Sequence, residues 1–122
     1  MDLKTQIGHR VYLEKLDGNL RNRLENGLEF IGWDKHINKN STVFIKPNFT
    51  FPNYKPGVTT TPEVLRAILE VLKNRAGRII VGESDGGNNS FKADEAFHGH
   101  NMYQICQESS AELINLSKLP QP

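Results

Sequence analysis

Two short apolar runs, at residues 42–45 and 78–81, are rich in β-branched side chains and are bounded by polar or turn-forming residues. Short runs of this kind are typical of buried parallel strands. Two other segments, residues 9–13 and 111–116, also have a strand pattern. The sequence therefore predicts about four strands.

Helical periodicity lies between the predicted strands. The first helical pattern has apolar residues at Leu20, Leu24, Leu28 and Ile31, and either Asn19 or Asp17 can cap it. The second follows Thr60 or Thr61 as its cap and has Pro62 in its first turn. Its apolar face consists of Leu65, Ile68, Leu69 and Leu72. Weaker helical signals follow at residues 92–97 and 103–108.

The alternation of strands and helices predicts an α/β fold with right-handed crossovers, a largely parallel sheet and three layers. A length of 122 residues corresponds to a single domain, residues 1–122. Parallel sheets need cover on both faces, and little sequence follows the last predicted strand. We therefore expect either the amino-terminal part of a larger protein, with a missing carboxyl-terminal portion, or a homo-oligomer.

Composition excludes several classes of protein. Fifteen Lys and Arg against fourteen Asp and Glu give a net charge of +1 without a basic stripe, so no nucleic-acid partner is expected. Cys106 is the single cysteine, which excludes an internal disulfide and a cysteine-only zinc or iron–sulfur site. No apolar run has the length of a signal peptide or a membrane span, so we expect a soluble, cytoplasmic protein without a membrane partner.

Polar clusters directly follow the two clearest strands, at residues 46–48 and 82–87. Ligands of open α/β sheets bind beyond the carboxyl ends of the strands, so we expect both clusters in one crevice. Lys46, Glu83 and Asp85 are the candidate catalytic residues. Lys46 would hold an anion, while Glu83 and Asp85 would act as general base or as ligands of a divalent metal. The alternatives are a structural ion pair between Lys46 and Glu83, and a tight turn at residues 85–88.

Further polar residues near these strand ends are candidate ligand-binding residues. They are Asn48, Thr59, Thr60, Thr61, Ser84, Gly86 and Gly87. The threonines precede the clearest helix, where unpaired amides favour an anion, although one threonine can serve only as the cap. His98 and His100 are further candidate metal ligands, and surface or capping roles are the alternative.

Several segments resemble the opening motifs of the domain-of-unknown-function 362 (DUF362) family. They are Val43-Phe44-Ile45-Lys46-Pro47-Asn48, Thr59-Thr60-Thr61-Pro62-Glu63-Val64, Ile79-Ile80-Val81-Gly82-Glu83-Ser84 and Ala96-Phe97. Family members are generally longer, and some carry ferredoxin-like cysteine motifs further along the chain. The resemblance therefore implies a partial version of the family domain without an iron–sulfur cluster. It implies no reaction, because the family has no general assigned activity.

Two classes of function fit the sequence. In the first, the edge of the sheet binds a small anionic ligand, with or without a divalent metal, and the question of catalysis stays open. In the second, the chain is a non-catalytic scaffold or partner-binding module. The long loop after residue 46 carries Phe49, Phe51 and Tyr54, which either pack the loop down or meet a ligand or partner.

Overall fold

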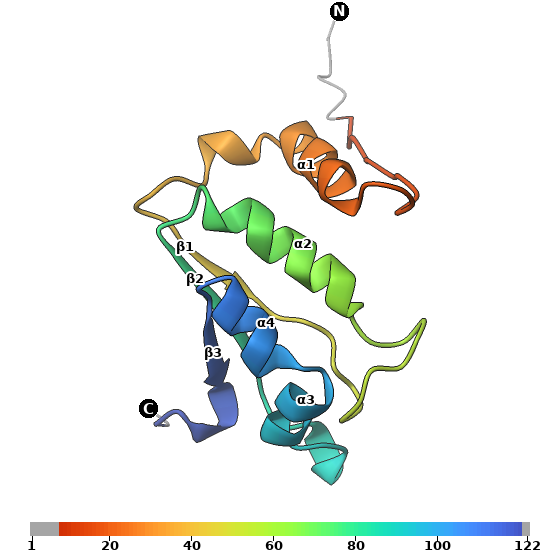
Figure 1. The fold of residues 1–122 in the computed structure, drawn as a ribbon, viewed down its shortest axis with the longest axis vertical. Helices are drawn as coiled ribbons and strands as arrows, with labels where there is room; N and C mark the ends of the chain where they lie inside the picture. Colours follow the sequence, from red (N-terminus) through yellow and green to blue (C-terminus); the bar gives the residue numbers. More distant parts are fainter. Residues whose placement is uncertain (1–7, 121–122) are drawn as a thin grey trace, which may run out of the picture.

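The structure is a computed structural model that describes residues 8–120, and it contains a three-stranded sheet and four α-helices (Figure 1). The strands are β1 (Thr42–Ile45), β2 (Arg78–Glu83) and β3 (Glu112–Asn115). The helices are α1 (Leu20–Phe30), α2 (Pro62–Lys73), α3 (Ala93–Gly99) and α4 (Met102–Glu108). Short 3₁₀ turns are η1 (Trp33–Lys35), η2 (Gly87–Asn89) and η3 (Leu116–Lys118). Within residues 8–120, no helix is both long and apolar enough to span a bilayer.

The sheet is parallel throughout, in the order β1-β2-β3, which confirms the predicted α/β class. It has three strands where the sequence predicted about four, because residues 9–13 pair with no strand. Tyr12 of that segment instead packs on Phe30 of α1, with ring centroids 5.4 Å apart. Val11 and Leu13 remain 84% and 94% exposed. The strand prediction failed here because β-propensity produces a strand only where a sheet edge is available.

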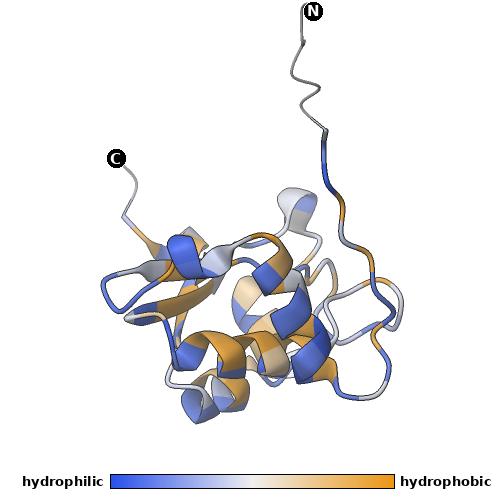
Figure 2. Cartoon of the chain, turned by 90° about the horizontal axis from the view of Figure 1, so that it is seen from above, coloured by the Kyte–Doolittle hydropathy of each residue, from blue (hydrophilic) through white to orange (hydrophobic). Residues whose placement is uncertain are grey.

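Helix α2, between β1 and β2, and helices α3 and α4, between β2 and β3, cover the same face of the sheet. Right-handed crossovers between consecutive neighbouring strands place their helices on one side. The core on this side joins the inward residues of the strands to α2, α3 and α4, and its largest members are Phe49, Phe97, Leu69, Met102, Ile105 and Val81. Figure 2 shows the corresponding division of these helices into apolar and hydrophilic sides. Helix α1 packs on α2.

The opposite face of the sheet has no helical cover within residues 8–120. Phe44 of β1 is 48% exposed there, and Ile80 and Ile114 are partly exposed. The Phe44 ring lies over Gly82, whose Cβ, if present, would be 2.6 Å from that ring. The described residues therefore form a helical layer and a sheet layer, where the sequence predicted three layers.

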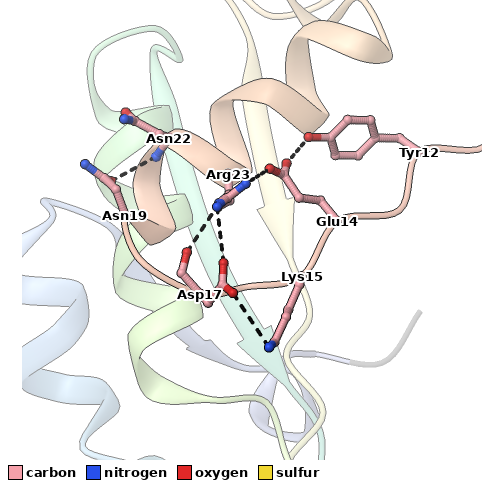
Figure 3. Close-up of polar contacts among 7 residues, drawn as sticks. All are labelled: Tyr12, Glu14, Lys15, Asp17, Asn19, Asn22 and Arg23. Carbon is pink, nitrogen blue, oxygen red and sulfur yellow. Dashed lines mark hydrogen bonds and ion pairs between the residues drawn. The ribbon is translucent and has the colours of Figure 1, made fainter.

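Helix α1 begins and ends with recognisable caps. Asn19, one of the two predicted caps, accepts a hydrogen bond from the Asn22 amide at 3.1 Å. Arg23 pairs with Glu14 and Asp17, which ties the extended amino-terminal segment to the helix (Figure 3). After α1, Gly32 adopts the left-handed conformation (φ 69°) that commonly ends a helix.

Candidate functional site

A cavity of about 570 Å³ opens beyond the carboxyl ends of β1 and β2. It lies where the polar clusters were predicted to meet. Seven of the predicted site residues line it: Lys46, Asn48, Glu83, Ser84, Asp85, Gly86 and Gly87. The fold therefore brings the two strand exits together around one space.

Lys46 and Glu83 form an ion pair across the adjacent ends of β1 and β2. The distance between Lys46 Nζ and Glu83 Oε2 is 3.3 Å, and the two side chains are 59% and 6% exposed. The second oxygen of Glu83 accepts a hydrogen bond from the Ser84 amide at 2.9 Å. The carboxylate is thus buried and engaged through both oxygens. The ammonium group also donates to the Pro47 carbonyl at 3.4 Å, so one of its three donors remains for the cavity.

Asp85 connects the second cluster to helix α3. Its Oδ1 accepts a hydrogen bond from the Ala93 amide at 2.8 Å, at the first residue of the helix. Its Oδ2 lies 3.4 Å from Lys92 Nζ, and its own amide donates to Ser117 Oγ at 2.9 Å. These contacts tie Asp85 to the start of α3 and to η3 rather than to a tight turn at residues 85–88, and the residue also lines the cavity. Within the described part of the chain, no group of three or more His, Cys, Asp or Glu side chains could hold a metal ion.

The loop between β1 and α2 is held by hydrogen bonds centred on Asn48. The Asn48 amide donates to Thr60 Oγ1 at 2.8 Å, and its side-chain nitrogen donates to the Val58 carbonyl at 2.9 Å. Thr59 is buried, and its Oγ1 accepts from the Lys55 amide at 2.9 Å. Thr61 occupies the cap position of α2 without a side-chain capping bond. The three threonines lie outside the cavity lining and, in the case of Thr59 and Thr60, stabilise the loop.

The two histidines also lie outside the cavity lining. His98 is exposed and makes an edge contact with Tyr103, at a centroid distance of 5.5 Å. His100 is 3% exposed, stacks on Phe49 and is hydrogen-bonded to the Phe51 carbonyl. The structure therefore separates the two imidazoles and places His100 in the core.

Four residues of the lining were not among the predicted ligand-binding residues. They are Thr50, Phe51, Ser90 and Phe91. Phe51 had a signal, because an aromatic residue in a long polar loop needs a packing or binding partner. Phe91 had no such signal in the sequence. It reaches the cavity because its loop closes through a hydrogen bond from the Gly86 amide to the Phe91 carbonyl at 2.8 Å.

Exposed ion pairs flank the sheet at both ends and shift the ionisation of their carboxylates. At the amino end, hydrogen bonds from Arg78 lower the pKa of Glu112. At the carboxyl end, hydrogen bonds from Lys118 and then Asn115 lower the pKa of Asp94. In the core, burial raises the pKa of the Cys106 thiol to about 11, so this cysteine is not an activated nucleophile.

One comparison with known proteins gives a match. The model of a family described as "Domain of unknown function (DUF362)" matches residues 43–121, which is more than half of the chain. The matched region contains β1 from its second residue, β2, β3, helices α2 to α4 and every residue of the cavity lining. None of the curated proteins and none of the solved structures matches the chain significantly.

Proposed function

The chain belongs to the DUF362 family, to which no function is assigned, and we propose that it binds a small anionic ligand in the cavity at the carboxyl end of the sheet. The observation that carries the proposal is Lys46, whose side chain is 59% exposed and lines a cavity of about 570 Å³. This is the region in which open α/β sheets bind ligands. The lysine supplies a compact positive charge and one donor that Glu83 and the Pro47 carbonyl do not use.

The other lining residues suit an anion bound at Lys46. The hydroxyls of Ser84 and Ser90 supply further donors, whereas the Thr50 hydroxyl already donates to Asn48 Oδ1 at 2.7 Å. Gly87 leaves open space, since an added Cβ there would meet nothing within 4 Å. A divalent cation belongs to the proposal as a second component, held by Glu83 together with the anion, because hard cations prefer oxygen ligands.

Substitutions of Glu83 and of Lys46 should change the affinity for the anion in opposite directions, which makes the proposal testable. In the structure this buried carboxylate takes part of the charge of Lys46, so it competes with any anion that enters. Glu83→Gln keeps the shape of the side chain and an acceptor for the Ser84 amide but removes the negative charge. Without a divalent cation, it should therefore strengthen anion binding, whereas Lys46→Met should abolish it.

Isothermal titration calorimetry with inorganic phosphate and with succinate, each with and without Mg²⁺, tests these expectations. Without Mg²⁺, we expect Glu83→Gln to tighten binding roughly tenfold, which corresponds to about 1.4 kcal/mol. Mg²⁺ should strengthen binding only where the Glu83 carboxylate is present. Lys35→Met is the control, because Lys35 is exposed in η1 and lies outside the cavity lining. Equal affinity of the wild type and Lys46→Met would contradict the proposal. Absence of binding in the wild type, combined with loss of stability in Lys46→Met, would identify the pair as structural only.

The uncovered face of the sheet favours a second candidate function, in which the chain is a partner-binding module. Phe44 is 48% exposed on that face, and parallel sheets are normally covered on both sides. A second copy of the chain is the partner to test first. Native mass spectrometry should show a dimer that Phe44→Ser disrupts and Val58→Ser, at an exposed loop position, leaves intact. A monomer at all concentrations would rule out a second copy of the chain as the partner.

A further inference from the structure

One wall of the cavity is a short stretch of loop with an unusual backbone. It consists of residues 49–51, of which Thr50 and Phe51 line the cavity. Thr50 has φ 39°, a left-handed conformation that β-branched residues rarely adopt. Phe51 keeps its ring 40% exposed, while Phe49 is only 1% exposed. Such a conformation persists only where the surroundings hold it in place.

Three contacts hold this wall: the Thr50 hydroxyl donates to Asn48 Oδ1 at 2.7 Å, Lys55 Nζ lies 4.4 Å from the Phe51 ring centroid, and His100 contacts both phenylalanines. His100 is the contact that comes from a distant part of the chain. Its Nε2 lies 2.9 Å from the Phe51 carbonyl oxygen, although the two residues are 49 positions apart in sequence. Its ring stacks on that of Phe49, with a centroid distance of 4.3 Å and an interplanar angle of 27°. A carbonyl can only accept, so Nε2 carries the proton and donates to Phe51.

The second ring nitrogen of His100, Nδ1, indicates why an imidazole occupies this position. Nδ1 of His100 is buried without a hydrogen-bond partner among the described residues. A buried polar atom without a partner is costly, and an apolar side chain of similar size would avoid that cost while still packing on Phe49. Within the described contacts, the feature that an imidazole adds is the bond from Nε2 to the Phe51 carbonyl. We therefore attribute the histidine at position 100 to its hydrogen bond with the wall at residues 49–51 rather than to packing in the core.

The neighbouring residue brings the helix close to the same loop. A Cβ on Gly99 would be 1.9 Å from the Pro52 carbonyl oxygen, so only glycine allows this approach. The end of α3 thus contacts residues 51 and 52 through two consecutive positions, Gly99 and His100.

We propose that His100 is a positioning residue that fixes the wall formed by residues 49–51 in the shape that receives the anion. This inference rests on the proposed function for the role of the cavity, but the anchoring of the wall can be measured without any ligand. His100 does not touch the ligand. It acts through the Phe51 carbonyl and the Phe49 ring.

The experiment uses the full chain and two readouts, backbone amide hydrogen exchange of residues 48–51 and affinity for inorganic phosphate. His100→Met removes the donor at similar size, and His100→Gln returns an amide donor near the position of Nε2. We expect His100→Met to speed exchange in residues 48–51 about tenfold and to weaken phosphate binding about three- to tenfold, as loss of one hydrogen bond allows. His100→Gln should restore both. If His100→Met does not fold, His100→Asn serves instead, because its shorter amide falls short of Phe51.

Cys106→Ala is the matched control, because Cys106 is also buried in this core and lies outside the cavity lining. It should leave exchange in residues 48–51 unchanged. Unchanged exchange in His100→Met, or failure of His100→Gln to restore it, would overturn the proposal. Faster exchange with unchanged phosphate affinity would overturn the positioning role. If the wild type binds no anion, the proposed function fails, and the exchange data alone still decide whether His100 anchors the wall.

Discussion

Each end of the sheet has an ion pair between a basic residue and a glutamate at neighbouring strands, and the two pairs differ in how far the carboxylate is buried. At the amino end, Arg78 of β2 pairs with Glu112 of β3, with the Arg78 Nη2 to Glu112 Oε1 distance at 2.8 Å. At the carboxyl end, Lys46 pairs with Glu83 across β1 and β2 at 3.3 Å. The side chains of the first pair are 55% and 47% exposed, whereas Glu83 is 6% exposed.

The difference in burial distinguishes a structural ion pair on the surface, at the amino end, from a candidate binding site at the carboxyl end. An exposed pair is screened by water and contributes little to folding or to binding. A buried carboxylate depends on its partner, and at the carboxyl end that partner lines the cavity of about 570 Å³. The exposed pair at the amino end borders a smaller cavity of about 290 Å³. The chemistry of the molecule is therefore expected at the carboxyl end, where one charge is fixed and the other is accessible.

The largest expected effects come from a glycine at each end that lies against a backbone carbonyl. A Cβ would be 2.0 Å from the Lys39 oxygen at Gly77, near the amino end, and 1.9 Å from the Pro52 oxygen at Gly99. Gly77→Ala and Gly99→Ala should each lower the free energy of unfolding by about 3 kcal/mol, because backbone must shift. Urea denaturation measures this loss. Gly99→Ala alone should also weaken phosphate binding, and an equal effect of Gly77→Ala on binding would break the comparison.

Removal of the cation at each end should have a smaller and unequal effect. Lys46→Met leaves the buried Glu83 carboxylate without its partner and should lower the free energy of unfolding by about 1–2 kcal/mol. Arg78→Met leaves an exposed carboxylate and should destabilise the protein less. The double variant Lys46→Met with Glu83→Gln should recover most of the loss. Chemical denaturation of all three variants checks this, and a larger loss in Arg78→Met would reverse the ranking.

The smallest expected effect is the pH dependence of the exposed pairs. Arg78 lowers the pKa of Glu112 in the folded protein, so this pair stabilises the fold above the unfolded value of about 4.3. Its contribution is lost as the pH falls through the lower folded value. In Arg78→Gln, carboxyl NMR titration should return the pKa of Glu112 to its ordinary range. High salt should reduce the shift in the wild type, and a pKa unchanged by the substitution would show that Arg78 is not its cause.

The sequence predicted the strands that have a neighbour and mispredicted the one that has none. Residues 42–45 and 78–81 are apolar enough to be buried together, and the structure pairs them in register from Thr42 with Arg78. Residues 9–13 also contain β-branched and aromatic side chains, but they pair with no strand, and only Tyr12 and Arg10 contact Phe30 of α1. The local sequence pattern indicates β-propensity. Strand pairing depends in addition on whether another segment of the chain comes to lie beside the strand.

The same limit applies to the candidate site. Residues 46–48 and 83–87 could be placed at one cavity because parallel strands deliver their ends to a common edge. Thr60 could not be assigned, because its hydroxyl is used by the Asn48 amide twelve positions earlier. His100 likewise owes its position to a contact with distant backbone, the Phe51 carbonyl, and Phe91 to a loop closure with the Gly86 amide. No local spacing encodes such contacts.

The one-sided placement of α2 and α4 also determines how the sheet can grow. A strand that followed β3 by a right-handed connection and joined beside β3 would add its helix to the covered side. A strand that joined beside β1 would have to bring its helix across the other side, directly over Phe44. That second route would reverse the winding of the sheet at β1 and create a topological switch point next to Lys46, where open α/β sheets place their ligands.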